Sequence, residues 1–155
     1  MIPIILQAEL KEVVLSLFDD KKFVAPEGES RKLSVFEQNL PQKQQKDDSP
    51  YPMVIIKLIE GGKEKREDPN VTNVGFIVGT YDENEDNQGY RDAVYILNRL
   101  HECFENQPVI GGTFELTGRI NWRLHEEDLD PYFFGVMETQ WAVPEHGRMD
   151  VEELI

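Results

Sequence analysis

The hydrophobic pattern is clearest between residues 73 and 104, where a strand and a helix follow one another. Residues 74–81 are mostly apolar and rich in β-branched side chains, which predicts a buried strand. Residues 82–89 are acidic and polar, so we expect a loop there. The following positions recur at i, i+3, i+4 and i+7, which predicts an amphipathic helix: Tyr90, Ala93, Val94, Leu97, Leu100, His101 and Phe104. The passage predicts a protein of mixed α and β structure.

Residues 3–18 predict an N-terminal helix with one buried face. Three charged residues, Glu9, Lys11 and Glu12, interrupt its apolar positions, and Pro3 is tolerated in a first helical turn. The polar run 19–22 ends the segment. The apolar residues behind this prediction are Ile4, Ile5, Ala8, Val13, Val14, Leu15, Leu17 and Phe18.

Strand-like runs account for most of the remaining ordered sequence. Residues 53–59 form a β-branched run that ends at Gly61-Gly62, and residues 71–81 form a second run after the charged excursion 63–70. A strand, a turn-rich loop and a strand in this order predict an antiparallel pair. Two later runs, 113–119 and 132–143, also predict strands, and a short strand is expected at 32–36.

The last strand alternates clearly between apolar and polar positions. Phe133, Met137 and Trp141, with Val143 beyond them, fall on one side, opposite Glu138 and Gln140. Side chains alternate between the two faces of a strand, so Trp141 is expected in the core. We therefore expect an α+β fold: a mostly antiparallel sheet of about four to five strands, with the N-terminal helix and the central amphipathic helix packed on it.

We expect residues 1–155 to form a single domain with two loosely structured parts. Residues 42–49 are polar or charged without an apolar anchor, which predicts a flexible loop at about 42–50. Long loops of this kind often belong to interaction surfaces. Residues from about 144 to 155 read as a C-terminal tail, with a short helix expected at 149–154.

The net charge of -14 excludes several classes of partner. So acidic a chain has no general attraction for phosphate backbones or anionic membranes, and we expect no sequence-specific nucleic-acid binding and no membrane contact.

Cys103 is the single cysteine, which excludes an internal disulfide and favours a reducing cytoplasm. It lies within a helical pattern and reads as a core or boundary residue. The sequence contains no apolar run of membrane-spanning length, and we expect no signal peptide.

One loop resembles a calcium site without completing it. Asp82-x-Asn84-x-Asp86 supplies the first three ligand positions of an EF-hand loop, but Asn87 and Ala93 occupy the places that need glycine and a bidentate glutamate. A surface-bound divalent cation on Asp82, Asn84 and Asp86 stays open as one interpretation. The other is a solvated turn whose acidic residues favour the dipole at the following helix N-terminus.

No arrangement in the sequence indicates catalysis. His101, His125 and His146 lack the spacing of a zinc site, and no Gly-x-Ser-x-Gly elbow occurs. We therefore expect no enzyme, no cofactor and no catalytic residue.

Several short motifs stand in a recognisable order. They are Leu40-Pro41, Tyr51-Pro52 opening the first long strand, Val78-Gly79-Thr80-Tyr81-Asp82 closing the second, Asp130-Pro131-Tyr132-Phe133-Phe134-Gly135 opening the last, and Val143-Pro144 ending it. With the N-terminal helix and the acidic loop that leads into the central helix, this order resembles the tail terminator (tail-completion) and related neck or minor tail proteins of long-tailed bacteriophages. The likeness spans most of the chain.

The resemblance implies a structural subunit that forms a ring, usually of six copies, which caps the finished tail tube and joins it to the head. The implied partners are further copies of the chain, the tail tube and the neck or head-completion proteins. The implied location is the virion, with the host cytoplasm during assembly. Contacts are expected from the central loop and the charged excursion: Gln42, Lys43, Gln44, Gln45, Lys46, Lys63, Glu64, Lys65, Arg66 and Glu67.

A second hypothesis comes from a different class. The alternative is a small cytoplasmic domain that binds a ligand or a divalent metal through the loop 82–86. The acidic charge also has two interpretations: a pore lining that does not grip DNA phosphates, or a device that keeps the monomer soluble before assembly.

Overall fold

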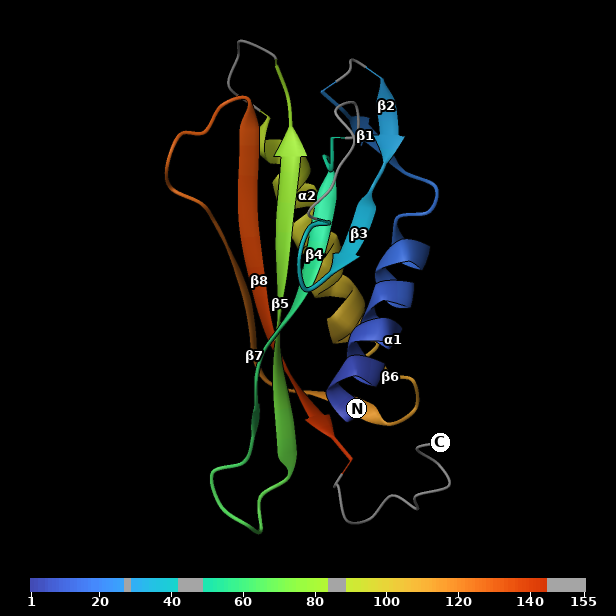
Figure 1. Ribbon diagram of the computed structural model, residues 1–155, viewed down its shortest axis with the longest axis vertical. Coiled ribbons are helices and arrows are strands. Elements are labelled where there is room, and N and C mark those ends of the chain that lie inside the picture. The colour runs from blue at the N-terminus through green and yellow to red at the C-terminus, as the bar shows by residue number, and fades with distance from the viewer. Residues whose placement is uncertain (27–28, 42–48, 84–88, 145–155) are drawn as a thin grey trace.

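The computed structural model describes residues 1–26, 29–41, 49–83 and 89–144 (Figure 1). The elements over these residues are α1 (Ile2–Leu17), β1 (Lys22–Val24), β2 (Ser30–Lys32), β3 (Ser34–Glu37), β4 (Met53–Gly62), β5 (Asn70–Tyr81), α2 (Tyr90–Asn106), β6 (Val109–Ile110), β7 (Phe114–Leu124) and β8 (Tyr132–Val143). Both predicted helices and the four long predicted strands are confirmed, with boundaries shifted by a few residues.

The described strands form one sheet of six strands and a separate two-stranded ribbon. The sheet has the order β3-β4-β5-β8-β7-β6, and β1 pairs with β2 in the ribbon. Every pair is antiparallel apart from β3 and β4, which are parallel. The α+β class and the mostly antiparallel sheet are thus confirmed. The expected number of strands, four to five, was too low, because the main sheet has six. The strand expected at 32–36 is divided at the buried Leu33 into β2 and β3.

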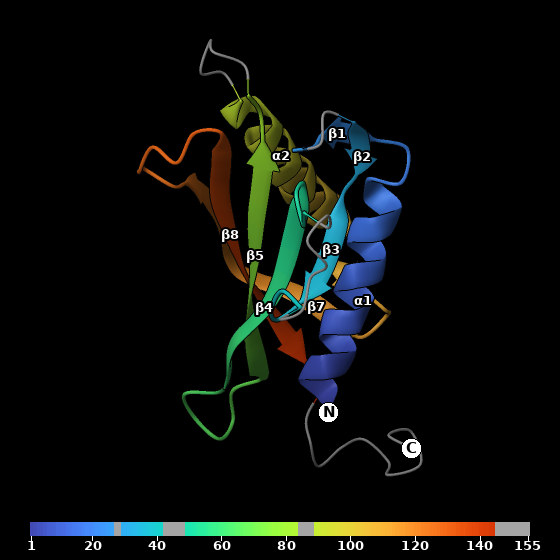
Figure 2. The same cartoon turned by 45° about the horizontal axis from the view of Figure 1, so that its top comes forward.

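The pairing register fixes which side chains face the helices. Phe76 lies opposite Ile56 of β4 on one side and opposite Met137 of β8 on the other. All three are fully buried and belong to the same core cluster as the inward residues of α1 and α2. The sheet curls around α2, and α1 runs along the β3 edge (Figures 1 and 2). Burial on this inner face is the main apolar contribution to stability.

Trp141 lies at the centre of this core, as predicted. Its indole Nε1 donates a hydrogen bond to Thr139 Oγ1 at 2.9 Å, and that hydroxyl donates to the Val74 carbonyl at 2.9 Å. The ring also meets Phe104 of α2 edge-on, with centroids 5.3 Å apart. Because the polar atom of the indole has a partner, a large ring is accommodated here without an unsatisfied donor.

Two of the predicted segments lie largely outside the described residues: the flexible loop, of which residues 42–48 are not described, and the tail, of which 145–155 are not described. None of the helices in the described part of the chain is long and apolar enough to cross a membrane.

Candidate functional site

The residues proposed for a divalent cation are only partly described. Asp82 follows the end of β5, and its backbone N–H donates to the Pro131 carbonyl at 2.9 Å, which ties the start of the loop to the start of β8. Asn84 and Asp86 lie outside the described residues. Among the residues that are described, no three His, Cys, Asp or Glu side chains gather in a way that could hold a metal ion.

The predicted contact residues fall into two groups. Gln42, Lys43, Gln44, Gln45 and Lys46 lie outside the described residues. Lys63, Glu64, Lys65, Arg66 and Glu67 are exposed on the β4–β5 connection, which extends beyond the end of the sheet (Figures 1 and 2). Lys65 and Asp68 close this connection with two hydrogen bonds: the Asp68 N–H donates to the Lys65 carbonyl at 3.0 Å, and the Lys65 N–H donates to the Asp68 side-chain Oδ2 at 3.1 Å. It is therefore a formed, solvent-facing turn of mixed charge.

Residues that carry the family resemblance meet on the outer face of the sheet. The Tyr51 ring lies 4.7 Å from that of Tyr132 and 6.0 Å from that of Phe134, centroid to centroid. Gly79 lies beneath them: a Cβ there would stand 2.8 Å from Met53 Cε and 3.0 Å from Tyr51 Cε1. Burial, followed by the neighbouring Tyr132, raises the pKa of the Tyr51 phenol. The cluster anchors the start of β4 onto β5 and β8, which is a packing role.

The half-buried Cys103 on α2 does not have the properties of a nucleophile. Burial raises the pKa of its thiol, while Arg99 acts weakly in the opposite direction. A thiol held in its protonated form is a poor nucleophile at neutral pH. The prediction of a boundary residue is confirmed.

Helix α1 carries apolar side chains on two opposite faces. Ile2, Leu6, Leu10 and Val14 recur every fourth residue and are buried against the sheet. Ile4, Ile5, Ala8 and Leu15 lie on the other side and are exposed. The sequence prediction was therefore right about one buried face but wrong about its members, since Ile4, Ile5, Ala8 and Leu15 are not in it. The unused signal was that the apolar residues of the segment are too many for one face, so some of them share the exposed side with Glu9, Glu12 and Ser16.

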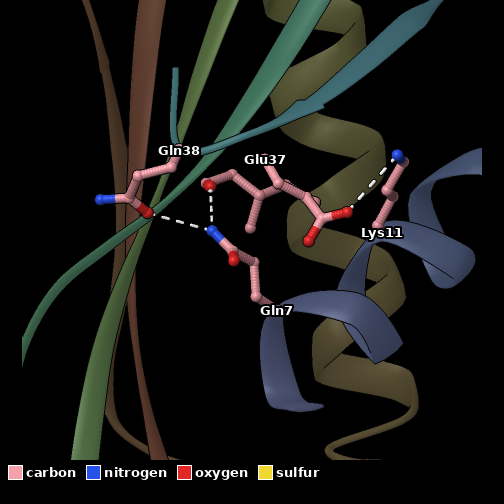
Figure 3. Close-up of polar contacts among 5 residues, drawn as sticks. Gln7, Lys11, Glu37 and Gln38 are labelled. Atoms are coloured by element: carbon pink, nitrogen blue, oxygen red, sulfur yellow. Dashed lines mark hydrogen bonds and ion pairs between the residues drawn. The ribbon is translucent and has the colours of Figure 1, made fainter. Parts of the chain in front are cut away.

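A polar contact fixes the rotation of α1 about its axis (Figure 3). Gln7 is only 5% exposed, and its Nε2 donates to the Ile56 carbonyl at 2.8 Å and to Gln38 Oε1 at 3.0 Å. Gln38 Oε1 also accepts a hydrogen bond from the Leu58 backbone N–H at 2.9 Å. Beside this contact, Lys11 Nζ forms an ion pair with Glu37 Oε1 at 3.5 Å. The helix is thereby pinned to the end of β3 and to the middle of β4, and its outer face is held towards solvent.

Strand β7 presents the longest unpaired edge in the described part of the sheet. One side pairs with β8, whereas on the other side only Phe114 and Glu115 pair with β6. A bulge between Thr117 and Asn121 interrupts the β8 ladder, and Gly118 within it has φ +64°. Arg119 within the bulge and Arg123 beyond it are exposed, while the alternate residues Ile120, Trp122 and Leu124 are half-buried.

No protein-family model and no curated protein matches this sequence.

Proposed function

We propose that this chain is a virion assembly subunit of a long-tailed bacteriophage, of the tail terminator type, which forms a ring that caps the tail tube and joins it to the head. The observation that carries the proposal is the second apolar face of α1. The family resemblance of the sequence supplies the identity of the assembly.

The exposed face of α1 is costly for a subunit that works alone. Ile4 is 53% exposed, Ile5 40% and Leu15 39%, all on one side of one helix. Large apolar side chains grouped on the exposed side of a helix favour a cover, because leaving them in water forgoes their transfer free energy. The Gln7 contact prevents α1 from rotating this face into its own core. The simplest resolution is a partner that covers it.

The net charge supports an assembly that waits for a signal. Like-charged subunits repel one another over about a Debye length, which is roughly 10 Å at 0.1 M salt. A chain of charge -14 therefore stays dispersed until salt, divalent cations or a template offsets the repulsion. Raising ionic strength or adding magnesium should move the population towards the ring.

The identity of the assembly has its own test. If the proposal is right, the gene should lie among capsid, portal and tape-measure genes, and interrupting it should leave heads and tails unjoined in electron micrographs of the lysate. Joined, infectious virions from the interrupted phage would contradict the proposal. Titration with calcium or magnesium separates it from the metal-binding alternative, which a tight one-to-one site would favour.

A further inference from the structure

We propose that the outer face of α1 is covered by the β7 edge of the neighbouring copy, in a head-to-tail contact. This inference rests on the proposed function, because it names the surfaces through which the ring would close. The partner is a second copy of this chain, and three features of the described residues support the contact.

The first feature is that β7 needs a cover of its own. The Leu116 N–H donates to the Pro108 carbonyl at 2.7 Å, and beyond it the edge from Thr117 to Leu124 has no strand partner among the described residues. Long unpaired edges invite uncontrolled pairing, and proteins manage them with bulges, with charged side chains, or with a helix laid over the edge. The Gly118 bulge and the two arginines protect the isolated subunit, and α1 of the next copy would complete the cover.

The second feature is that the apolar content of the two surfaces matches. The half-buried Ile120, Trp122 and Leu124 of β7 pack against the core and leave part of each side chain in contact with solvent. The exposed Ile5 and Leu15 of α1 are of comparable size. Bringing these surfaces together removes both from water, with an aromatic ring at the centre, as is usual for a stable interface.

The third feature is charge complementarity. The exposed Glu12 lies among the outward apolar side chains of α1, and Glu9 lies at one border of them, beside Gly111 of its own chain. Lys11 lies at the other border and is paired with Glu37.

The exposed Arg119 and Arg123 project from β7, and both have acidic neighbours in their own chain: Arg123 lies 3.7 Å from Glu138, and Arg119 lines a surface hollow with Glu60 and Glu138. Their side chains are exposed, so they stay accessible to the glutamates of a second copy. Opposite charges on the two surfaces select this pairing over contacts of α1 with α1 or of β7 with β7.

The positions of the two surfaces determine the kind of assembly. In both views α1 lies on one side of the molecule, and the end of β7 that leads into β8 lies on the other (Figures 1 and 2). A contact between two different patches is head-to-tail, so it continues from copy to copy and closes into a ring when the rotation permits. A two-fold dimer would instead use one patch twice.

Two charge-reversal variants test the contact. One carries Arg119→Glu and Arg123→Glu on β7, and the other carries Glu9→Lys and Glu12→Lys on α1. Sedimentation velocity at one protein concentration and moderate salt compares the wild type, each variant and an equal mixture of the two variants. Thermal unfolding of each variant, followed by circular dichroism, confirms that these exposed positions leave the fold intact.

We expect each variant alone to associate about tenfold or more weakly than the wild type, because its own α1 and β7 surfaces then carry like charges. In the equal mixture, every contact between the two variants pairs opposite charges, so assembly should return. General repulsion makes a different prediction: the α1 variant has a net charge of -14 plus 4, or -10, and should associate more strongly than the wild type.

Three results would overturn the inference. Stronger association of the α1 variant, unchanged association of both variants, or a mixture that fails to recover would each exclude this contact while leaving a ring through other surfaces intact. A wild type that stays monomeric at every concentration and salt would instead contradict the proposed function, and this contact with it.

Discussion

Two neighbouring residues of α1 allow its inner and outer faces to be tested separately. Leu6 is fully buried against the sheet, and Ile5 is 40% exposed on the opposite face. We consider Leu6→Ala, which removes core packing, and Ile5→Lys, which places a charge on the outer face and keeps good helix propensity. The account predicts that the first change affects folding and the second affects assembly.

The expected magnitudes follow from burial. Truncating a fully buried leucine to alanine typically costs about 2–5 kcal/mol, from lost transfer free energy and the remaining cavity. For a domain of this size about 1 kcal/mol corresponds to roughly 2–4 °C, so Leu6→Ala should lower the melting temperature by about 4–20 °C. An exposed substitution usually stays within about 0.5 kcal/mol, so Ile5→Lys should shift it by less than about 2 °C.

Two measurements separate these effects. Circular dichroism follows thermal unfolding at low protein concentration, and sedimentation velocity follows oligomers at high concentration. Ile5→Lys should lose the oligomer and keep the melting temperature of the monomer. Asn98→Lys, at an exposed position on α2, makes the same change in charge and serves as the matched control, so it should preserve both. Unchanged oligomers in Ile5→Lys, or equal losses in Asn98→Lys, would refute the role of the outer face.

Three further predictions concern the fold and its charges. Trp141→Ala should cost about 3–5 kcal/mol in urea unfolding, because the ring is fully buried and hydrogen-bonded, and a loss below about 1 kcal/mol would contradict its place in the core. Gly135→Ala should cost about 1–3 kcal/mol in the same assay, because the added Cβ would stand 2.5 Å from Leu97 Cδ1 and 3.2 Å from the Arg123 carbonyl oxygen. An unchanged free energy of unfolding would show that the Leu97 side chain and α2 move aside without cost. Burial, followed by the nearby Asp82, raises the pKa of Asp92, so Asp92→Asn should raise the melting temperature at pH 7. That gain should shrink as the pH falls through the raised pKa and vanish below the ordinary carboxyl range, where Asp92 is neutral in both states; an equal gain at pH 3 would exclude this cause.

The elements that could be predicted are those whose pattern is long enough to show a period. Helix α2 and the strands β4, β5, β7 and β8 each span ten or more residues, so burial leaves a clear mark on their sequences. The strands β1, β2 and β6 have two or three residues each, which is too short for alternation to be seen. Their pairing is decided by tertiary contacts, such as the place of β6 beside the start of β7.

The candidate surfaces were harder to predict, for a physical reason. The sequence shows that the α1 segment is apolar, but which face is buried depends on the Gln7 contact with Ile56 and Gln38, which are far away in the chain. The free edge of β7 depends on the strand order, which no local pattern contains. Sequence reasoning therefore placed the contacts in charged loops, whereas the contact that we propose uses an apolar helix face and a strand edge.

The mass of the assembled chain in solution tests the central claim most directly. Sedimentation velocity or native mass spectrometry should be run at high protein concentration, with and without raised salt and magnesium. The account predicts a shift from the 18.0 kDa monomer to a closed ring, which for six copies is about 108 kDa, and its share should grow with salt and magnesium. A closed dimer under every condition would contradict the account, because a two-fold contact occupies a surface that a head-to-tail ring must keep free.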